Sequence, residues 1–548
     1  MFDVLIRGGS IVDGTGKSAY KGDIGIKGDK IIEIGDLSLA ESKEFIDAEG
    51  MVVSPGFIDT HVHSDAVLLT NPQHPQGVMQ GITTEILGQD GLSYAPLSKK
   101  NFLEYSRYLK GILGSPPEDM KTASVAEFRS NYHKKTAINT AYLIAHGALH
   151  LEVLGFQDRR MSGDLMSRAK DLVREGMEQG AVGLATGLTY HPHAWSYTEE
   201  IIELCKVVSE FGGVYVTHLR DVNTDRAIGG GGIPEALAVG KLSSVKVHFS
   251  HHRTAEKTAG KVNARMSLID QAKSEGVDVT GDLYPYPTGS TFPMASMPSY
   301  VHQGGTQAIL DVLSDKDGFK QMSDYFNESN RLSKILPDPE SEKASLQKPR
   351  DHTLDLDGTI LTFVPGNPEY EGVPVKEAAE NMGMSMGEAM CKLLLDSELC
   401  IGFWGTPPDN VQVWDQLGKD FIEILSRDDF MVGSDSIHLG KFRHPRGHGT
   451  FPRFLGRLRR KYDLISLEKI VNRVTGTPAD RFGLTKRGYL KTGFFADVVV
   501  FNPETLIDTA TYDDPIQYPI GISHVLVNGT IAVSESKCTG KLNGYSIP

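Results

Sequence analysis

The sequence predicts an α/β fold, namely a TIM-like (β/α)8 barrel with a small β-sandwich domain built from both chain ends. Two observations lead to this prediction. Eight short apolar segments alternate with helical stretches through the middle of the chain, which is typical of parallel βαβ units. Short strand patterns separated by glycine turns occupy both ends, so we expect the two ends to pair with each other.

The predicted barrel strands are short, apolar and spaced by segments long enough for a helix. They cover Gly56–His63, Thr83–Leu87, Ala141–His146, Val182–Thr186, Val214–Leu219, Val245–His251, Val277–Tyr284 and Met431–Asp435. Helical patterns lie between most of them, for example over Leu165–Gln179 and Thr198–Phe211. The connection from the seventh to the eighth strand is too long for a simple loop, so about residues 286–400 are predicted as an insertion. Long connections near a barrel mouth often form lids, and a surface excursion without a catalytic role is the alternative.

Strand patterns rather than βαβ units mark the two chain ends. They cover Val4–Ile6, Ser10–Val12, Asp23–Ile26 and Lys30–Ile34 near the N-terminus, and Ala496–Phe501 and His524–Val527 near the C-terminus. We therefore expect residues 1–55 and 481–548 to form one β-sandwich, with the barrel of residues 56–480 inserted between them.

The composition is that of an ordinary globular chain with an acidic balance. Of 548 residues, 40% are hydrophobic and 23% are charged, and the net charge is −14. This charge argues against a nucleic-acid partner, although a local basic pocket could still bind an anionic substrate. We expect neither a signal peptide nor membrane contact, because no segment has the required apolar pattern. The four cysteines are scattered, which predicts reduced thiols and a cytoplasmic location.

Side chains that bind metals end several of the predicted strands. His61 and His63 lie two residues apart, so strand geometry directs both imidazoles to the same side. Such a pair by itself is more often ordinary packing, but further donors end other strands: Asp90, His218, His251 and Asp435. Because the C-terminal ends of barrel strands meet at one mouth, these residues predict a site for zinc or a similar divalent ion.

The motifs around these residues resemble the D-aminoacylase (N-acyl-D-amino-acid deacylase) family of the metal-dependent amidohydrolase superfamily. The similarity extends over nearly the full length and includes PGFIDTHVH, GQDGLSYAPL, VTHLRD, FSHHR, LYPYPTGST, GSDSIH and RHPRGHGTFPR. It implies an amidohydrolase barrel with a small β-sandwich, in agreement with the pattern described above. Superfamily members that use a carbamylated lysine, such as hydantoinases, are disfavoured, because the predicted fourth strand contains no lysine.

The resemblance implies two metal positions. One would be lined by His61, His63 and Asp435, and the other by His218 and His251. The residue nearest both is normally a cysteine in the family, and here Asp90 takes its place in Gly88-Gln89-Asp90-Gly91. A carboxylate can still bridge two metals, but it is harder than a thiolate. We therefore expect one or two zinc ions, with manganese or cobalt as alternatives; a simple turn-forming role is the alternative for Asp90.

The activity implied by the resemblance is hydrolysis of the amide bond of N-acyl-D-amino acids, which releases a carboxylate and the D-amino acid. A divalent metal would activate a water molecule and polarise the acyl carbonyl. We predict that Asp435 takes the proton of this water as general base and returns it to the departing amine as general acid. The D-configuration rests on the resemblance alone.

Five residues are candidates for binding the substrate. Guanidinium groups bind carboxylates in a bidentate manner, and Arg253 and Arg446 both follow strands at the predicted mouth. Tyr284, Ser290 and Tyr190 resemble pocket residues of the family, and packing is the alternative for Tyr190. The preferred substrate side chain and the oligomeric state stay open.

Two other classes of function remain as alternatives. Another hydrolase on the same scaffold, such as a dipeptidase or a cyclic-amide hydrolase, would use the same ligands. A catalytically silent homologue could act as a scaffold, but the intact ligand set and Asp435 argue against that interpretation.

Overall fold

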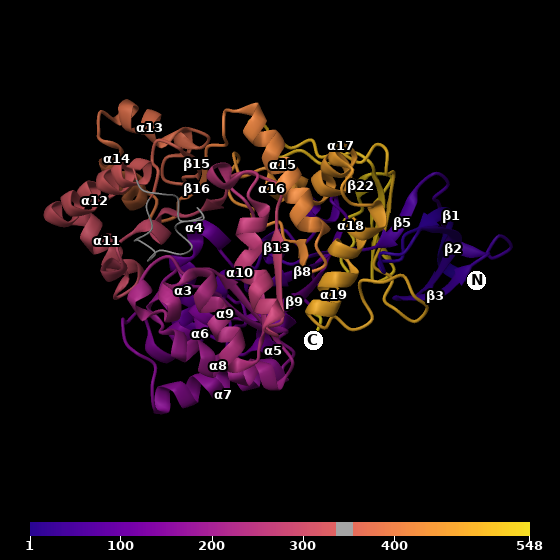
Figure 1. The fold of residues 1–548 in the computed structure, drawn as a ribbon, viewed down its shortest axis with the longest axis horizontal. Coiled ribbons are helices and arrows are strands. Elements are labelled where there is room, and N and C mark those ends of the chain that lie inside the picture. Colours follow the sequence, from indigo (N-terminus) through magenta and orange to yellow (C-terminus); the bar gives the residue numbers. More distant parts are fainter. Residues whose placement is uncertain (336–353) are drawn as a thin grey trace.

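The centre of the molecule is a barrel of eight parallel strands, seen in a computed structural model that describes residues 1–335 and 354–548 (Figure 1). The sheet order is β17-β13-β12-β11-β10-β9-β8-β6. The bounds are β6 Phe57–Asp59, β8 Ile82–Leu87, β9 Asn139–Ala145, β10 Gly183–Gly187, β11 Val214–His218, β12 Lys246–Phe249, β13 Val279–Leu283 and β17 Phe430–Val432. The eight predicted strands are thereby confirmed in number, order and direction.

The edge strands β6 and β17 meet and bring the barrel close to closure. The Thr60 backbone N–H donates to the Val432 carbonyl at 3.3 Å. Just beyond it, β7 (Val62–His63) pairs in parallel with β18 (Ser436–Ile437). The prediction of one uninterrupted strand over residues 56–63 is wrong, because the chain leaves β6 at Thr60, where Asp59 Oδ1 accepts a hydrogen bond from the His61 backbone N–H at 3.2 Å.

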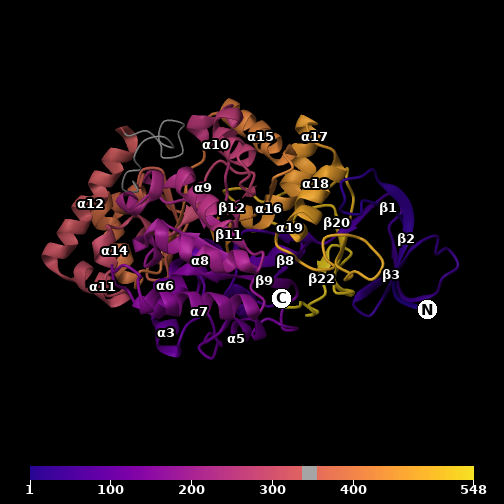
Figure 2. The ribbon, with the colours of Figure 1, turned by 60° about the horizontal axis from the view of Figure 1, so that its bottom comes forward.

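Helices surround the barrel on the outside (Figures 1 and 2). Those that follow or precede the central strands are α7 (Asp164–Glu178), α8 (Thr198–Glu210), α9 (Gly232–Ser243), α10 (Val262–Ser274) and α15 (Val411–Ser426). The helices α7 and α8 match the two predicted helical segments within one residue at each end. In the part of the chain that the structure describes, no helix combines the length and apolarity needed to cross a membrane.

The interior of the barrel is filled by side chains and closed at the end opposite the mouth. Alternate strand residues, including Ile86, Leu143 and Val216, form a buried cluster of their own. Ile547 joins this cluster from the C-terminal tail, whose backbone bonds to Thr140 at the start of β9. The packed bottom leaves the C-terminal ends of the strands as the open face.

Both chain ends contribute to a nine-stranded, mostly antiparallel sheet, as predicted. Its order is β22-β21-β20-β19-β5-β1-β2-β3, with β4 beside β1. The bounds are β1 Phe2–Ile11, β2 Tyr20–Lys27, β3 Lys30–Gly35, β4 Ser42–Asp47, β5 Val52–Pro55, β19 Val498–Phe501, β20 Ile522–Val527, β21 Thr530–Ser534 and β22 Lys537–Cys538. The chain passes into the barrel at Gly56, where a Cβ atom would lie 2.0 Å from the Thr83 hydroxyl, so the passage requires glycine.

An excursion between β13 and α15 carries its own helices and sheet, and lies at the end of the molecule opposite the nine-stranded sheet (Figures 1 and 2). Its helices are α11 (Thr306–Ser314), α12 (Lys316–Ile335), α13 (Val375–Met382) and α14 (Met386–Asp396). Its antiparallel strands are β14 (Ser290–Thr291), β15 (Thr359–Phe363) and β16 (Gly402–Gly405). These elements occupy and slightly exceed the predicted insertion, of which residues 336–353 lie outside the described part of the chain.

Candidate active site

The six side chains predicted as metal ligands come together at the barrel mouth. Each follows or ends a strand: His61 and His63 at β6–β7, Asp90 after β8, His218 at the end of β11, His251 after β12 and Asp435 after β17. Their donor atoms form three overlapping groups of three residues, and within each group all atoms lie within 4.8 Å of one another. Four of the six are buried, whereas His218 and His251 are partly exposed, and the exposed fraction of the His218 side chain is 21%.

Asp90 lies between the two predicted sets of ligands. Its Oδ1 is 3.5 Å from His61 Nε2, and its Oδ2 is 3.5 Å from His63 Nε2 and 3.8 Å from His218 Nδ1. Asp435 Oδ1 faces the first pair as well, at 3.6 Å from His61 Nε2 and 3.3 Å from His63 Nε2. The second pair is linked by His218 Nδ1 and His251 Nε2, which are 2.9 Å apart.

These separations match donors that share a metal ion. Two atoms that each lie about 2.1 Å from a tetrahedral zinc are about 3.4 Å from one another. The four contacts of His61 and His63 with Asp90 and Asp435 run from 3.3 to 3.6 Å, longer than charge-assisted hydrogen bonds. The donor set of imidazoles and carboxylates therefore fits a divalent metal.

Three of the six residues have a left-handed backbone, with φ of 56° at Asp90, 36° at His251 and 53° at Asp435. Residues other than glycine adopt this region at a cost of roughly 1–3 kcal/mol, and such strain concentrates at functional sites. Asp90 is indeed a turn former, since its tight turn begins at Gly88, where a Cβ atom would lie 2.2 Å from the Leu143 carbonyl. The turn also directs the carboxylate of Asp90 at His61, His63 and His218.

The centre is buried, and the carboxylates of Asp90 and Asp435 lie among its histidines. Within the described part of the chain, neither ring nitrogen of His61 forms a hydrogen bond, and Asp90 Oδ1 accepts none. Burial alone would lower the pKa of His61, but Asp90, Asp282 and Asp435 outweigh it and raise that pKa well above its usual value. The pKa of Asp90 is correspondingly held well below its usual range, against burial, chiefly by His61. A metal cation at the centre would offset the negative charge of these carboxylates.

An ion pair not predicted from the sequence joins two of the predicted residues. Arg446, which is fully buried at the start of α16 (Arg446–Pro452), places Nη1 2.7 Å from Asp435 Oδ2. Burial raises the pKa of Asp435, but Arg446 and the nearby histidines lower it more, and the net shift is well below its usual value. The free carboxylate is thus a weak base while Arg446 remains against it.

The five predicted substrate-binding residues form a continuous wall beside this centre. The Tyr284 ring lies between the guanidinium groups of Arg253, at 4.5 Å, and Arg446, at 4.7 Å, and its hydroxyl accepts a hydrogen bond from Arg253 Nη2. Arg446 Nη2 donates to the Ser290 carbonyl at 3.1 Å. The ring of Tyr190 packs against that of His218, with centroids 5.2 Å apart. Tyr190 therefore lies directly beside a candidate ligand, and its hydroxyl lies 3.3 Å from that of Thr291, the residue after Ser290.

A segment from the far end of the chain completes the rim. Residues 502–521, between β19 and β20 of the nine-stranded sheet, reach the barrel mouth, where the Tyr512 hydroxyl lies 2.9 Å from the Thr288 hydroxyl and 3.2 Å from His444 Nε2. The other ring nitrogen of His444 accepts a hydrogen bond from the Arg446 backbone N–H at 3.1 Å. Tyr512 is thereby connected to the arginine that pairs with Asp435.

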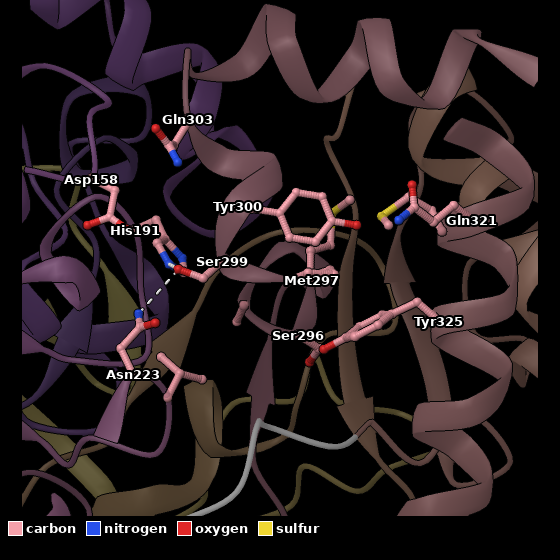
Figure 3. Close-up of a pocket in the computed structure, with 14 residues that line it drawn as sticks. Asp158, His191, Asn223, Ser296, Met297, Ser299, Tyr300, Gln303, Gln321 and Tyr325 are labelled. Atoms are coloured by element: carbon pink, nitrogen blue, oxygen red, sulfur yellow. Dashed lines mark hydrogen bonds between the residues drawn. The ribbon is translucent and has the colours of Figure 1, made fainter. Parts of the chain in front are cut away.

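A separate pocket of about 460 Å³ lies between the barrel loops and the insertion (Figure 3). His191 and Asn223 line it on the barrel side, and Tyr300 and Tyr325 on the insertion side. Ser299 connects the two sides, because its hydroxyl accepts from Asn223 Nδ2 at 3.3 Å. The described residues that line the pocket include none of the six candidate ligands, so the pocket is separate from the candidate metal positions.

Two residues that contact the candidate ligands were missed in the sequence. Asp282, at the end of β13, accepts a hydrogen bond from the His251 backbone N–H at 2.6 Å. His193 Nε2 lies 2.9 Å from the Asp90 carbonyl and so supports its strained turn. A carboxylate close to the C-terminal end of the seventh strand was a signal for Asp282, whereas nothing in the sequence singled out His193 from the other histidines.

Comparisons with known proteins agree with this geometry. A family model described as the amidohydrolase family matches residues 44–197 and 423–533. D-aminoacylase from Alcaligenes xylosoxydans xylosoxydans is 32% identical over 99% of this chain and 97% of that protein. N-acyl-D-aspartate deacylase from the same organism is 31% identical over 96% of this chain and 91% of that protein.

A solved structure extends the similarity to three dimensions. N-acyl-D-glutamate deacylase from Bordetella bronchiseptica, complexed with zinc and a phosphonate that mimics the tetrahedral intermediate, superposes with a TM-score of 0.78 at 28% identity, covering 100% of this chain and 99% of that one. Similarity of sequence and of fold thus spans the whole chain, including the barrel, the end sheet and the insertion. The chain belongs to the D-aminoacylase family of the metal-dependent amidohydrolases.

Proposed function

We propose that this protein hydrolyses the amide bond of N-acyl-D-amino acids and releases a carboxylate and the free D-amino acid. The observation that carries the proposal is the position of Asp90 between two groups of histidines at the barrel mouth, with Asp435 beside one of them. Relatives over the full length are a D-aminoacylase and an N-acyl-D-aspartate deacylase, which supports the substrate class and its configuration.

The residues present would hold one or two divalent metal ions, with zinc as the first candidate. His61, His63 and Asp435 would hold one ion, His218 and His251 the other, and the two oxygens of Asp90 would serve both positions. When bound, such an ion polarises an acyl carbonyl and makes a coordinated water molecule more acidic. Because Asp90 provides hard oxygen ligands where the family has a cysteine, we expect manganese and cobalt to support activity better here than at a thiolate site.

Asp435 would move the proton that the reaction requires. Its carboxylate lies at the mouth, beside His61 and His63, and can accept a proton from the attacking water and pass it to the leaving amine. In the substrate-free protein, Arg446 holds this carboxylate in its weakly basic form. We infer that a substrate carboxylate bound by Arg446 shares the guanidinium charge, so that Asp435 gains basicity when substrate is present.

The wall beside the centre would orient the substrate. Arg446 and Arg253 flank Tyr284 and bring two positive charges close to the mouth of an acidic protein. One guanidinium group can bind the α-carboxylate that every N-acyl amino acid carries. Tyr190 and Ser290 would border the same space, because the Tyr190 hydroxyl lies 3.3 Å from that of Thr291, next to Ser290.

The location proposed for this protein is the cytoplasm. All four cysteines are free thiols in the structure, and three of them are buried. This usage is typical of a reducing compartment, where disulfides rarely persist.

The test is amine release from matched N-acetyl-D- and N-acetyl-L-amino acids, measured with zinc, with manganese and with a chelator. Turnover of the D series alone, abolished by the chelator and restored by metal, is the expected result. Turnover of cyclic amides or dipeptides instead, by protein that contains metal, would assign a different hydrolase activity to the scaffold. Protein that retains metal but hydrolyses none of these amides would refute the proposal and favour the role of a silent scaffold.

A further inference from the structure

Asp282 occupies a central position behind the candidate metal ligands. It is fully buried near the end of β13, the seventh barrel strand. Its carboxylate accepts hydrogen bonds from Thr60, just after the first barrel strand β6, and from His251, just after the sixth barrel strand β12. Of these two strands, β12 is the neighbour of β13 in the sheet. Asp282 is not one of the six predicted metal ligands.

One oxygen of Asp282 fixes the backbone of His251. Oδ1 accepts a hydrogen bond from the His251 backbone N–H at 2.6 Å, at a residue whose φ is 36°. A strained backbone of this kind persists only where its surroundings hold it. The hydrogen bond to Asp282 is therefore one of the contacts that point the His251 ring at His218.

The other oxygen lies behind the ring of His61. Oδ2 accepts from His248 Nε2 at 2.9 Å and from the Thr60 hydroxyl at 3.4 Å, and it is 3.8 Å from His61 Nδ1. At 3.8 Å the His61 contact is electrostatic rather than a formed hydrogen bond. Its negative charge still favours the tautomer with the hydrogen on Nδ1, which leaves the Nε2 lone pair directed at Asp90 and Asp435.

Packing prevents the carboxylate from shifting. At Gly433, a Cβ atom would lie 2.9 Å from Asp282 Cγ and 2.5 Å from His61 Cβ, so the two side chains fill the space beside this glycine. His248 is itself anchored, because its second ring nitrogen lies 2.8 Å from the Thr280 hydroxyl. Asp282 therefore has a fixed orientation toward both His61 and His251.

We propose that Asp282 is a positioning residue that sets the geometry of both metal positions at once. His61 belongs to one predicted position and His251 to the other, and one carboxylate holds them through its two oxygens. The inference rests on the metal-dependent function proposed above, but its test measures metal binding and needs no substrate. Loss of Asp282 should weaken both positions together, whereas loss of a ligand that serves one position should weaken chiefly that one.

The experiment compares zinc binding to the wild type, Asp282→Asn and Asp420→Asn by competition with a chromophoric chelator. Asparagine keeps the size of Asp282 but removes its charge, which weakens the hydrogen bond from the His251 N–H and removes the negative charge behind His61. Asp420, on α15, is the control, because it is also a fully buried aspartate but accepts hydrogen bonds from the Gly260 N–H and the Thr254 hydroxyl rather than from groups on the candidate ligands. Circular dichroism and thermal melting of the metal-free proteins check that each variant is folded.

We expect Asp282→Asn to lower the zinc affinity of both positions by about 10–100-fold, the range for residues that orient metal ligands. Asp420→Asn should retain the wild-type affinity. With cobalt in place of zinc, the visible absorption bands of Asp282→Asn should shift, because the ligand geometry changes. Wild-type affinity at either position in folded Asp282→Asn would overturn the inference, as would an equal loss in Asp420→Asn.

His248→Phe provides a second variant if Asp282→Asn fails to fold. Phenylalanine fills the space of the imidazole next to Phe482 but removes the hydrogen bond that anchors Asp282. Zinc affinity should fall several-fold although His248 is not one of the six candidate ligands, and unchanged affinity would contradict the proposal. A wild type that binds two zinc ions without hydrolysing any amide would refute the proposed function while leaving this inference testable on the same samples.

Discussion

Replacing Asp90 by asparagine separates the bridging role proposed for this residue from its role in the turn. Asparagine has nearly the same size and tolerates the left-handed backbone that Asp90 adopts at φ 56°. It removes the negative charge and leaves one oxygen in place of two. Since Oδ1 faces His61 and Oδ2 faces His63 and His218, the variant can no longer present an oxygen to all three histidines, and it offers no negative charge to either metal position.

The expected magnitude follows from these contacts. Changes that only orient metal ligands cost about 10–100-fold in affinity, and loss of an inner ligand should reach at least the upper end of that range. We therefore expect Asp90→Asn to bind one zinc ion where the wild type binds two, with an affinity at least about 100-fold lower, equivalent to about 2.7 kcal/mol.

The assay is titration of metal-free protein with zinc against a chromophoric chelator, together with elemental analysis of the purified protein. Asp463→Asn is the matched control, because Asp463 is also an aspartate with a left-handed backbone (φ 50°) but is exposed at the end of α17 (Arg459–Tyr462). If folded Asp90→Asn retains two zinc ions at wild-type affinity, Asp90 is only a turn former and the bridging role is refuted.

Four further predictions concern the reaction and the fold. Asp435→Asn should lower kcat by about 10²–10⁴-fold with the far-UV spectrum unchanged, and near-normal turnover would exclude the proton-transfer role. Arg446→Met should raise KM for N-acyl-D-amino acids by about 10–100-fold, the loss expected for a charged hydrogen bond, and an unchanged KM in steady-state kinetics would remove Arg446 from the substrate site. Burial raises the pKa of Glu200 to about 7 from an ordinary value of 4.5, so the folded state loses up to about 3 kcal/mol of stability as the pH rises from 4.5 through 7. Glu200→Gln should therefore have a higher melting temperature than the wild type at pH 8 and nearly the same melting temperature at pH 4.5. A difference in melting temperature that does not change with pH would contradict the raised pKa. Ile547→Ala should cost about 2–4 kcal/mol of stability in denaturant unfolding while zinc content stays constant, because Ile547 packs into the barrel interior far from the mouth.

The fold was predictable because its signals are local. Each barrel strand is a short apolar segment, and the helices between strands have clear periodicity, so α7 and α8 were located within one residue at each end. The break between β6 and β7 was not predictable, because it depends on a hydrogen bond to Asp59 and on pairing with β18, more than 370 residues away.

The candidate ligands and the residues of the neighbouring wall could be picked out in the sequence, but the contacts that hold them in place could not. Histidines and aspartates at strand ends are visible in the sequence, and the barrel brings strand ends together. The partners of these ligands depend on which strands are neighbours in space: Asp282 contacts Thr60, 222 positions earlier in the chain. The ion pair of Arg446 with Asp435 depends likewise on how the loop after the eighth strand folds back, which no spacing reveals.

The segment of residues 502–521 limits how members of this family could be recombined. It starts and ends in the sheet built from the chain ends, yet Tyr512 at its tip touches Thr288 and His444 at the barrel mouth. A chimera that joins this barrel to the end sheet of a relative would therefore also exchange part of the rim of the active site. Designs that transfer substrate preference between relatives should treat this C-terminal segment as part of the catalytic module, although it is encoded together with the sheet.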